Sequence, residues 1–126
     1  MDVGTGARLT AAGGIDPAPL SDDDPEGDVE LPAGGTVVWS FDGATRVEAY
    51  TLTGPDRPVP AASWLLEALI DGAWATIDAR EAEPFEWPGQ LRAFVLDASV
   101  TAEAVRLVPG TALRLAQVEL LALTAR

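Results

Sequence analysis

The arrangement of short apolar segments between turn residues constrains the fold of this chain more than any other feature of its sequence. Residues 36–41 and 46–52 are rich in β-branched and aromatic side chains, and Asp-Gly and Gly-Pro pairs follow them. Turn signals of this kind recur roughly every 8–12 residues, a spacing typical of a β-sandwich or barrel. The sequence therefore predicts an all-β fold with about eight strands. The predicted strands are residues 8–12, 36–41, 46–52, 64–70, 74–78, 91–96, 104–108 and 113–123.

The breaks between these segments carry two further expectations. Asp42-Gly43 predicts a tight turn between neighbouring strands, and Asp97-Ala98-Ser99 predicts a second break. Residues 111–123 also have a good helix-forming composition, so a helix is an alternative there. No segment shows a long helical periodicity between clear caps.

The length and the apolar content fit one domain over residues 1–126. A chain of this length buries about two-thirds of its unfolded surface, and 48% of its residues are hydrophobic, enough for a core. The first residues lack a basic stretch followed by an apolar run, so we expect no signal peptide. No apolar run is long enough to span a bilayer. We also expect the domain to have been excised from a larger protein.

The charge of the chain excludes several classes of partner. Eight arginines and 20 acidic residues give a formal net charge of −12, and there is no lysine or histidine. Such a chain repels phosphate backbones and anionic lipid headgroups, so we expect neither nucleic acid binding nor membrane insertion. Neutral ligands such as sugars, and cations, are compatible with this charge.

The residue inventory also argues against catalysis. Without histidine, cysteine or lysine the chain has no Ser–His pair, no Cys–His pair, no Schiff-base amine and no zinc site of cysteine and histidine. Two carboxylates at a suitable separation can hydrolyse a glycosidic bond, but a solvated acidic surface is the simpler interpretation. We therefore expect a binding module and not an enzyme.

The aromatic residues divide into a predicted core set and one loop residue. The predicted core set lies in or beside strands and comprises Trp39, Phe41, Tyr50, Trp64 and Trp74. Of these, we expect Trp64 and Trp74 to pack between the two sheets. Trp87 lies in a Pro/Gly loop, where its indole could stack on a sugar ring, cap the core or pack against a neighbouring domain.

Three motifs carry a resemblance to a known family. They are Tyr50-Thr51-Leu52, Ser63-Trp64-Leu65-Leu66-Glu67-Ala68 and Asp71-Gly72-Ala73-Trp74-Ala75-Thr76-Ile77-Asp78. Their order and spacing resemble the discoidin family, which comprises the coagulation factor V/VIII (F5/8) type C domains and the galactose-binding-like carbohydrate-binding modules. Later segments, Leu91-Arg92-Ala93-Phe94, Val105-Arg106-Leu107 and residues 113–121, resemble the family's following strands. The chain departs from the pattern where Leu69 replaces a serine and where one residue is missing before Trp74.

The resemblance implies a β-sandwich jelly roll of about eight main strands. It implies a non-catalytic carbohydrate-binding module that tethers an attached glycoside hydrolase to glycans. The pattern is most similar to modules of bacterial exo-α-mannosidases and related secreted hydrolases, which implies an extracellular location and a catalytic domain in cis. The alternative is a structural module that packs against its catalytic domain and binds no sugar.

A structural calcium ion is a further implication of the resemblance. Residues 20–25 resemble a family loop that holds calcium in many members, which makes Asp22 and Asp24 candidate ligands. Gln117 takes the place of the family's glutamate on the closing strand, and Glu119 follows two residues later. A solvated acidic turn is the alternative interpretation.

Candidate contacts for a sugar lie in or near the loops. Trp87 could stack on a ring, while Arg57, Arg80 and Arg92 could bind a ligand through bidentate hydrogen bonds. Arg106 is expected to be structural. The loops predicted to carry the site are residues 22–28, 56–62 and 83–89, and the identity of the sugar is left open.

Overall fold

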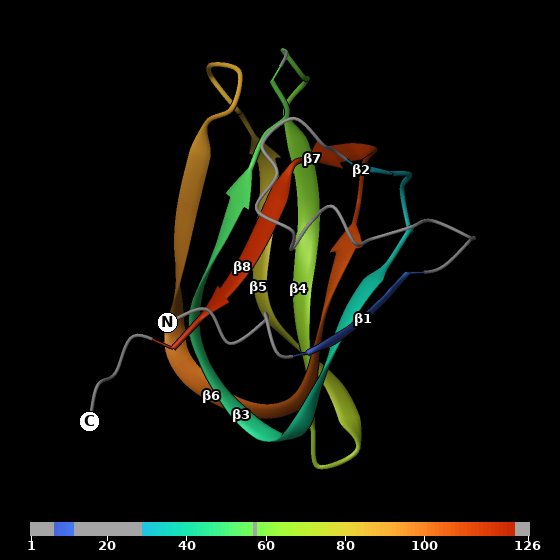
Figure 1. The fold of residues 1–126 in the computed structure, drawn as a ribbon, viewed down its shortest axis with the longest axis vertical. Helices are drawn as coiled ribbons and strands as arrows, with labels where there is room; N and C mark the ends of the chain where they lie inside the picture. The colour runs from blue at the N-terminus through green and yellow to red at the C-terminus, as the bar shows by residue number, and fades with distance from the viewer. Residues whose placement is uncertain (1–6, 12–28, 57, 123–126) are drawn as a thin grey trace.

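The computed structural model describes residues 7–11, 29–56 and 58–122, and the fold is built from β-strands (Figure 1). The strands are β1 (Arg8–Ala11), β2 (Val29–Leu31), β3 (Val37–Thr53), β4 (Ala62–Ile70), β5 (Ala73–Glu83), β6 (Leu91–Pro109), β7 (Leu113–Leu115) and β8 (Gln117–Leu121). The predicted all-β class and strand number are confirmed. The described residues contain no helix, and hence none that could cross a membrane.

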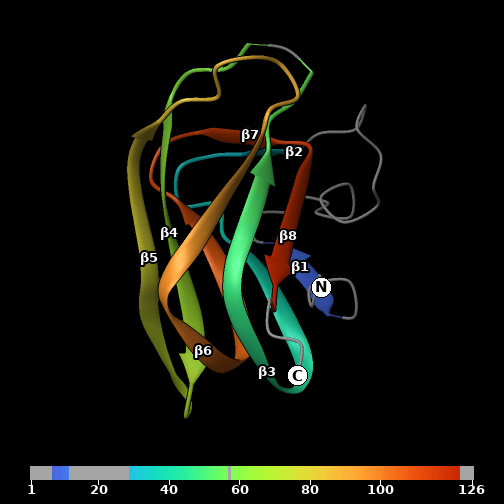
Figure 2. The same ribbon diagram turned by 90° about the vertical axis from the view of Figure 1, so that its left-hand side faces the viewer.

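Two layers form because the long strands β3 and β6 belong to both of them. The larger layer has the order β1-β3-β6-β4-β5, and its β3 contribution is Val37–Ser40. In the smaller layer the second half of β3 pairs with the first half of β6 and with β8. Figures 1 and 2 show β3 and β6 curving together at one end as they pass between the layers. The short β2–β7 pair lies at the opposite end.

The predicted breaks at Asp42-Gly43 and at Asp97-Ala98-Ser99 are wrong as strand ends. In each case the strand continues, and the pairing register shifts, first between Ser40 and Thr45 and then between Val47 and Ala49. Such bulges bend a strand, and here they produce the curve that carries β3 and β6 between the layers. Gly43 has a φ of 100°, which suits the first of these irregularities.

The hairpin between β4 and β5 forms where the sequence predicts a turn. Asp71 and Gly72 have φ values of 52° and 81°, the left-handed conformations that a two-residue hairpin loop needs. Residues 64–70 form part of β4, and most of residues 111–123 form β7 and β8. The helical alternative for residues 111–123 is therefore wrong for the described part of that segment.

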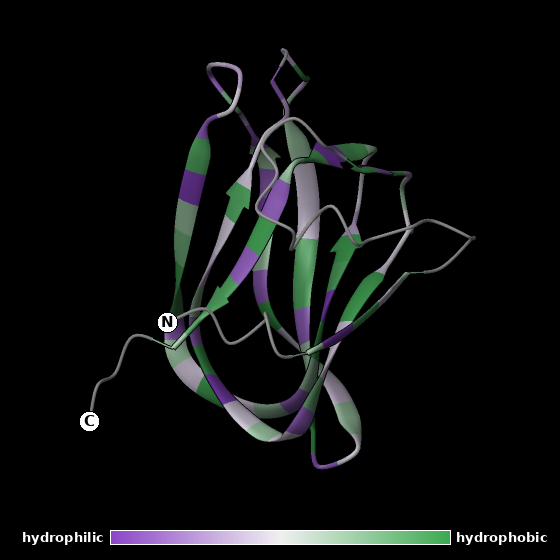
Figure 3. Cartoon of the chain, in the orientation of Figure 1, coloured by the Kyte–Doolittle hydropathy of each residue, from purple (hydrophilic) through white to green (hydrophobic). Residues whose placement is uncertain are grey.

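The core lies between the layers and is lined mainly by alternate residues of β2, β3, β4, β6, β7 and β8. Trp39, Tyr50 and Trp64 are almost fully buried there, and Phe41 packs at its margin. Figure 3 shows the corresponding alternation of apolar and polar residues along the strands.

The prediction for Trp74 is wrong, because this side chain lies on the outer face of the larger layer. It pairs in register with Leu69, and the Arg106 guanidinium lies 4.1 Å from its ring centroid. A register shift between Leu66 and Glu67 separates Trp74 from the inward-facing end of β5. Arg106 also pairs with Glu67 at 2.6 Å, in agreement with its expected structural role.

Candidate functional site

Two loops meet at the end of the sandwich opposite the bend of β3 and β6 (Figures 1 and 2). They are residues 54–61, between β3 and β4, and residues 84–90, between β5 and β6. The Gly54 amide donates to the Gln90 carbonyl at 2.9 Å, and the Gly89 amide donates to the Pro55 carbonyl at 2.9 Å. These paired hydrogen bonds hold the two loops together, and we call these two loops the platform.

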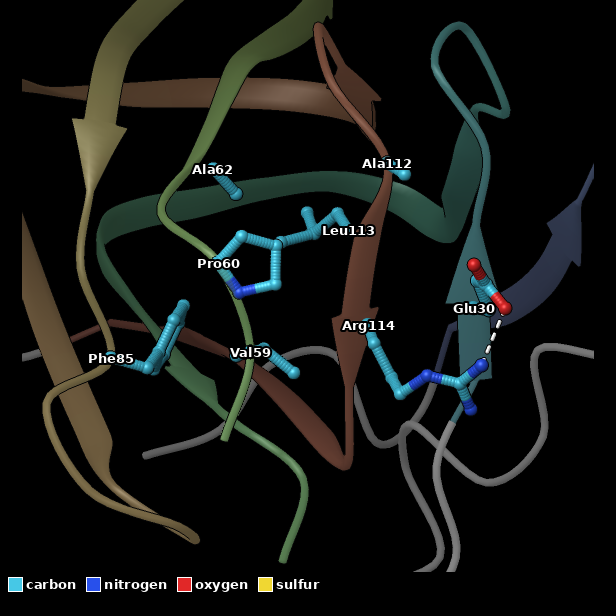
Figure 4. Close-up of a pocket in the computed structure, with 8 residues that line it drawn as sticks. All are labelled: Glu30, Val59, Pro60, Ala62, Phe85, Ala112, Leu113 and Arg114. Carbon is cyan, nitrogen blue, oxygen red and sulfur yellow. Dashed lines mark hydrogen bonds and ion pairs between the residues drawn. The ribbon is translucent and has the colours of Figure 1, made fainter. Parts of the chain in front are cut away.

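A small pocket of about 120 Å³ opens beside this platform (Figure 4). Its lining is apolar except for one acid and one arginine, and consists of Glu30, Val59, Pro60, Ala62, Phe85, Ala112, Leu113 and Arg114. Small-molecule pockets typically have roughly 300–1,000 Å³. The pocket can therefore receive one face or edge of a small ring and not a whole oligosaccharide.

One wall of the pocket depends on a close approach between Gly54 and Phe85. A Cβ atom added at Gly54 would lie 3.1 Å from Cδ1 of the Phe85 ring, closer than ordinary van der Waals contact. Glycine at this position lets the Phe85 ring lie against the neighbouring loop, where it is largely buried. The ring thus serves as a fixed apolar wall.

The polar part of the pocket is the ion pair between Glu30 and Arg114. The antiparallel register of β2 and β7 places these residues directly opposite each other, and an Arg114 guanidinium N–H donates to Glu30 Oε1. The Glu30 side chain is 57% exposed, compared with 30% for Arg114. The carboxylate is therefore the more accessible of the two charges.

Trp87 lies in the same loop as Phe85, but its side chain is exposed to solvent. Residues 87–90 form a turn in which the Gln90 amide donates to the Trp87 carbonyl at 3.2 Å and Gly89 has a φ of 73°. Proline and glycine at the two central positions are typical of a type II turn. With 59% of its surface exposed, the indole is available for stacking on a ligand.

Arg80 and Arg92 come together around one buried ring. Their guanidinium carbons lie 4.7 Å and 5.1 Å from the centroid of Phe94. Each also has a carboxylate partner: Arg80 pairs with Asp78 at 3.0 Å and Arg92 pairs with Glu83 at 2.7 Å. Arg92 donates in addition to the Pro84 carbonyl at 3.0 Å, which ties it to the loop that carries Trp87.

A buried network joins this cluster to the core. The Tyr50 hydroxyl donates to Asp78 at 2.6 Å and accepts from Trp64 Nε1 at 2.9 Å. Burial and the hydrogen bond to Asp78 raise the pKa of Tyr50 well above its ordinary value, so the phenol is neutral. Its role is structural, since a neutral buried phenol has no access to solvent or ligand.

The remaining predicted residues fall into two groups. Arg57, Asp22 and Asp24 lie outside the described residues. Gln117 and Glu119 lie on β8, where both side chains are partly exposed, and Glu119 accepts a hydrogen bond from Thr51 at 2.9 Å. They offer two oxygen-bearing side chains, whereas calcium takes six to eight oxygens, so these two alone do not make a calcium site.

The sequence did not single out Glu30 and Arg114, the two charged residues of the pocket. Glu30 and Arg114 are far apart in the chain and belong to no motif, and the β2–β7 register brings them together. Phe85 and Pro60 do lie in the two loops that the sequence marks as candidates, residues 83–89 and 56–62.

The fold is similar to that of several solved structures, although no protein-family model and no curated protein matches the sequence. One similar structure is CpGH89CBM32-5 from Clostridium perfringens in complex with GalNAc-β-1,3-galactose. Its TM-score is 0.76 at 14% identity, over 97% of this chain and 100% of that one. Another is the CBM32 of AlyQ in complex with 4,5-unsaturated mannuronic acid, with a TM-score of 0.74 at 11% identity over 90% and 93% of the two chains.

A third structure contains a catalytic domain as well. It is a truncated AlyQ with CBM32 and alginate lyase domains, matched with a TM-score of 0.73 at 11% identity. The match covers 90% of this chain and 31% of that protein. The chain therefore has the galactose-binding-like β-sandwich fold of these carbohydrate-binding modules, as the resemblance to the discoidin family implied.

Proposed function

We propose that this chain is a non-catalytic carbohydrate-binding module whose ligand binds at the end of the sandwich formed by residues 54–61 and 84–90. The observation that carries the proposal is the apolar pocket with one ion pair at its rim, on a fold shared with sugar-binding modules. A pyranose ring has an apolar face of C–H groups and a periphery of hydroxyls. The pocket offers a matching surface for both.

The residues that line the pocket and the platform beside it have distinct roles in this proposal. Phe85 and Pro60 would contact the apolar face of the sugar, and Glu30 and Arg114 would hydrogen-bond its hydroxyls. Trp87, two residues from Phe85, would stack on a neighbouring ring of an oligosaccharide. The pocket volume suits one face or edge of a single ring, so further rings would lie on the exposed loop surface.

The three arginines predicted from the sequence are proposed as secondary contacts. Arg80 and Arg92 each use part of their five N–H donors, on Asp78 for Arg80 and on Glu83 and the Pro84 carbonyl for Arg92, and both side chains are partly exposed. Arg80 also lines an open hollow of about 580 Å³ with Ser63 and Leu65. Arg57 belongs to the loop of residues 54–61.

A binding screen tests the proposal. Oligosaccharides of neutral, amino and acidic sugars are titrated into the folded domain by isothermal titration calorimetry, and Trp87→Ala is compared with the parent chain. We expect at least one sugar to bind, and we expect Trp87→Ala to weaken binding while changing stability by less than about 0.5 kcal/mol. The proposal would be wrong if no sugar in the screen bound to the folded domain.

We further propose that the module works in cis with a secreted glycoside hydrolase or lyase. The architecture of the truncated AlyQ, in which such a fold accompanies a catalytic domain, supports this arrangement. It implies an extracellular location and a glycan-tethering role. Co-purification of a longer gene product with hydrolase activity on the bound glycan would test it.

A second candidate function is docking on a catalytic domain without sugar binding. Leu91 and Val95 on β6 favour it, because they are large apolar side chains that are 55% and 66% exposed on the same face of one strand. Val95→Glu should then weaken association with the catalytic domain and leave sugar titrations unchanged. The opposite pattern favours the carbohydrate-binding proposal.

Calcium at Asp22, Asp24, Gln117 and Glu119 is a separate proposal. An ion held by residues distant in the sequence would stabilise the folded state by mass action. Removal of calcium with a chelator should then lower the melting temperature, and added calcium should restore it. A melting temperature indifferent to both would leave the acidic residues 22–24 as a solvated turn.

A further inference from the structure

At the proposed sugar-binding end, the described arginines are paired with acids, whereas several acidic side chains are exposed to solvent. The described arginines there each have a carboxylate partner: Arg80 with Asp78, Arg92 with Glu83, and Arg114 with Glu30. Arg114 has a further interaction besides this ion pair. An acidic sugar would therefore compete with a carboxylate already paired to each described arginine at this end.

The pocket itself presents a carboxylate to solvent. Glu30 is the more exposed partner of its ion pair, at 57% of its side chain against 30% for Arg114. It lies at the rim of a lining in which its partner Arg114 is the other charged residue. Asp56 and Glu86, on the two loops of the platform, are exposed and add to the negative potential.

We infer that the pocket selects amino sugars, with Glu30 accepting a hydrogen bond from the ligand's ammonium group. The inference rests on the proposed carbohydrate binding and names the class of sugar. A protonated amine gains a charge-assisted hydrogen bond at Glu30, an N-acetylated sugar gains only a neutral one, and a uronic acid is repelled. Glu30 is thus the specificity-determining residue of the pocket.

The test compares three ligands that differ in charge. Trimers of glucosamine, of N-acetylglucosamine and of galacturonic acid are titrated at one pH and at low ionic strength. We expect the glucosamine trimer to bind roughly tenfold more tightly than its N-acetylated counterpart. The galacturonic acid trimer should bind least.

Two matched variants distinguish a direct contact between Glu30 and the ligand from a general effect of the negative charge of the domain. Glu30→Gln should remove the preference for glucosamine and, because it removes the negative charge opposite Arg114, raise the affinity for galacturonic acid. Glu103→Gln makes the same charge change at the opposite end of the sandwich, beside Asp71 and Gly72, and should leave the preference unchanged. Circular dichroism and thermal melting establish that both variants are folded.

Several outcomes would overturn the inference while leaving the proposed function intact. Equal affinity for the glucosamine and N-acetylglucosamine trimers would do so, as would a preference that Glu103→Gln reduces as strongly as Glu30→Gln. The domain could instead prefer galacturonic acid and lose that preference in Arg57→Gln. Arg57, on the loop of residues 54–61, would then bind the acidic sugar, and the inferred preference for amino sugars would be wrong. Failure of all sugars, including neutral ones, contradicts the proposed function itself.

Discussion

The hydroxyl of Tyr50 on β3 donates a hydrogen bond of 2.6 Å to Asp78 on β5, across the core between the two layers. Tyr50 belongs to the half of β3 that pairs within the smaller layer, whereas Asp78 belongs to the larger layer. Trp64 on β4 donates to the same hydroxyl at 2.9 Å. One phenol oxygen therefore links strands from both layers just below the end that carries residues 54–61 and 84–90.

Removal of this oxygen should destabilise the domain. Tyr50→Phe leaves the buried indole N–H of Trp64 without its acceptor and removes the donor to Asp78. We expect a loss of about 1–3 kcal/mol in the free energy of unfolding, measured by urea denaturation. Tyr50→Phe combined with Trp64→Phe completes a double-mutant cycle, and full additivity of the two losses would show that the hydrogen bond contributes nothing.

The same phenol predicts a decline in stability at alkaline pH. Burial and the hydrogen bond to Asp78 raise the pKa of Tyr50 in the folded state. The unfolded chain releases this proton near pH 10, so above about pH 10 it binds fewer protons than the folded chain. The stabilising contribution is complete below that pH and is lost as pH rises through the folded pKa, by up to about 1.4 kcal/mol per pH unit.

Ultraviolet absorbance offers a direct readout of that titration. Tyr50 is the single tyrosine of the chain, so the phenolate signal belongs to it alone. We expect the signal to appear together with unfolding, and Tyr50→Phe to remove the associated part of the pH dependence. A phenolate signal that rises near pH 10 in the folded domain would contradict the assigned environment.

The pocket wall should respond to a single methyl group on the neighbouring loop. Gly54→Ala places a Cβ 3.1 Å from the Phe85 ring, so the ring must move by a few tenths of an ångström. We expect weaker sugar binding by calorimetry and a stability loss of about 1 kcal/mol. Gly110→Ala is the control, because its nearest neighbour, the Ser63 carbonyl oxygen, lies at 3.4 Å. Equal behaviour of the two variants would mean that the approach of Gly54 to Phe85 has no role.

The strand pattern of this fold is largely predictable from sequence, but the path of the long strands is not. Asp42-Gly43 has the composition of a turn, and in the structure it lies within β3. The pairing with β6 continues on both sides of the bulge, and these long-range hydrogen bonds outweigh the local turn preference. Asp and Gly occur both where a strand bends and where it ends, so the sequence does not distinguish a bend from an end.

The orientation of residues on β5 was unpredictable for a related reason. A strict alternation along β5 would place Trp74 and Asp78 on the same face. The register shift between Leu66 and Glu67 breaks that alternation, so Trp74 lies outside under Arg106 while Asp78 turns inward to Tyr50. One extra residue on β5 thus accounts for the wrong prediction of Trp74.

The candidate site was predictable at the level of loops and not of residues. The Pro/Gly content of residues 56–62 and 83–89 marks them as loops, and the position of Trp87 in one of them follows from its sequence. The opposition of Glu30 and Arg114 follows from the β2–β7 pairing, which joins two three-residue strands with no distinguishing pattern.

Obstruction of the pocket is the most direct test of carbohydrate binding at this end of the sandwich. Ala112 is exposed and lines the pocket, so Ala112→Trp can fill its mouth without disturbing the core. Ala98→Trp places the same side chain at an exposed position on the bend of β6 and is the matched control. Calorimetric titration with the best sugar should show affinity reduced more than about tenfold in Ala112→Trp and unchanged in Ala98→Trp. Unchanged affinity in a folded Ala112→Trp domain would contradict the account.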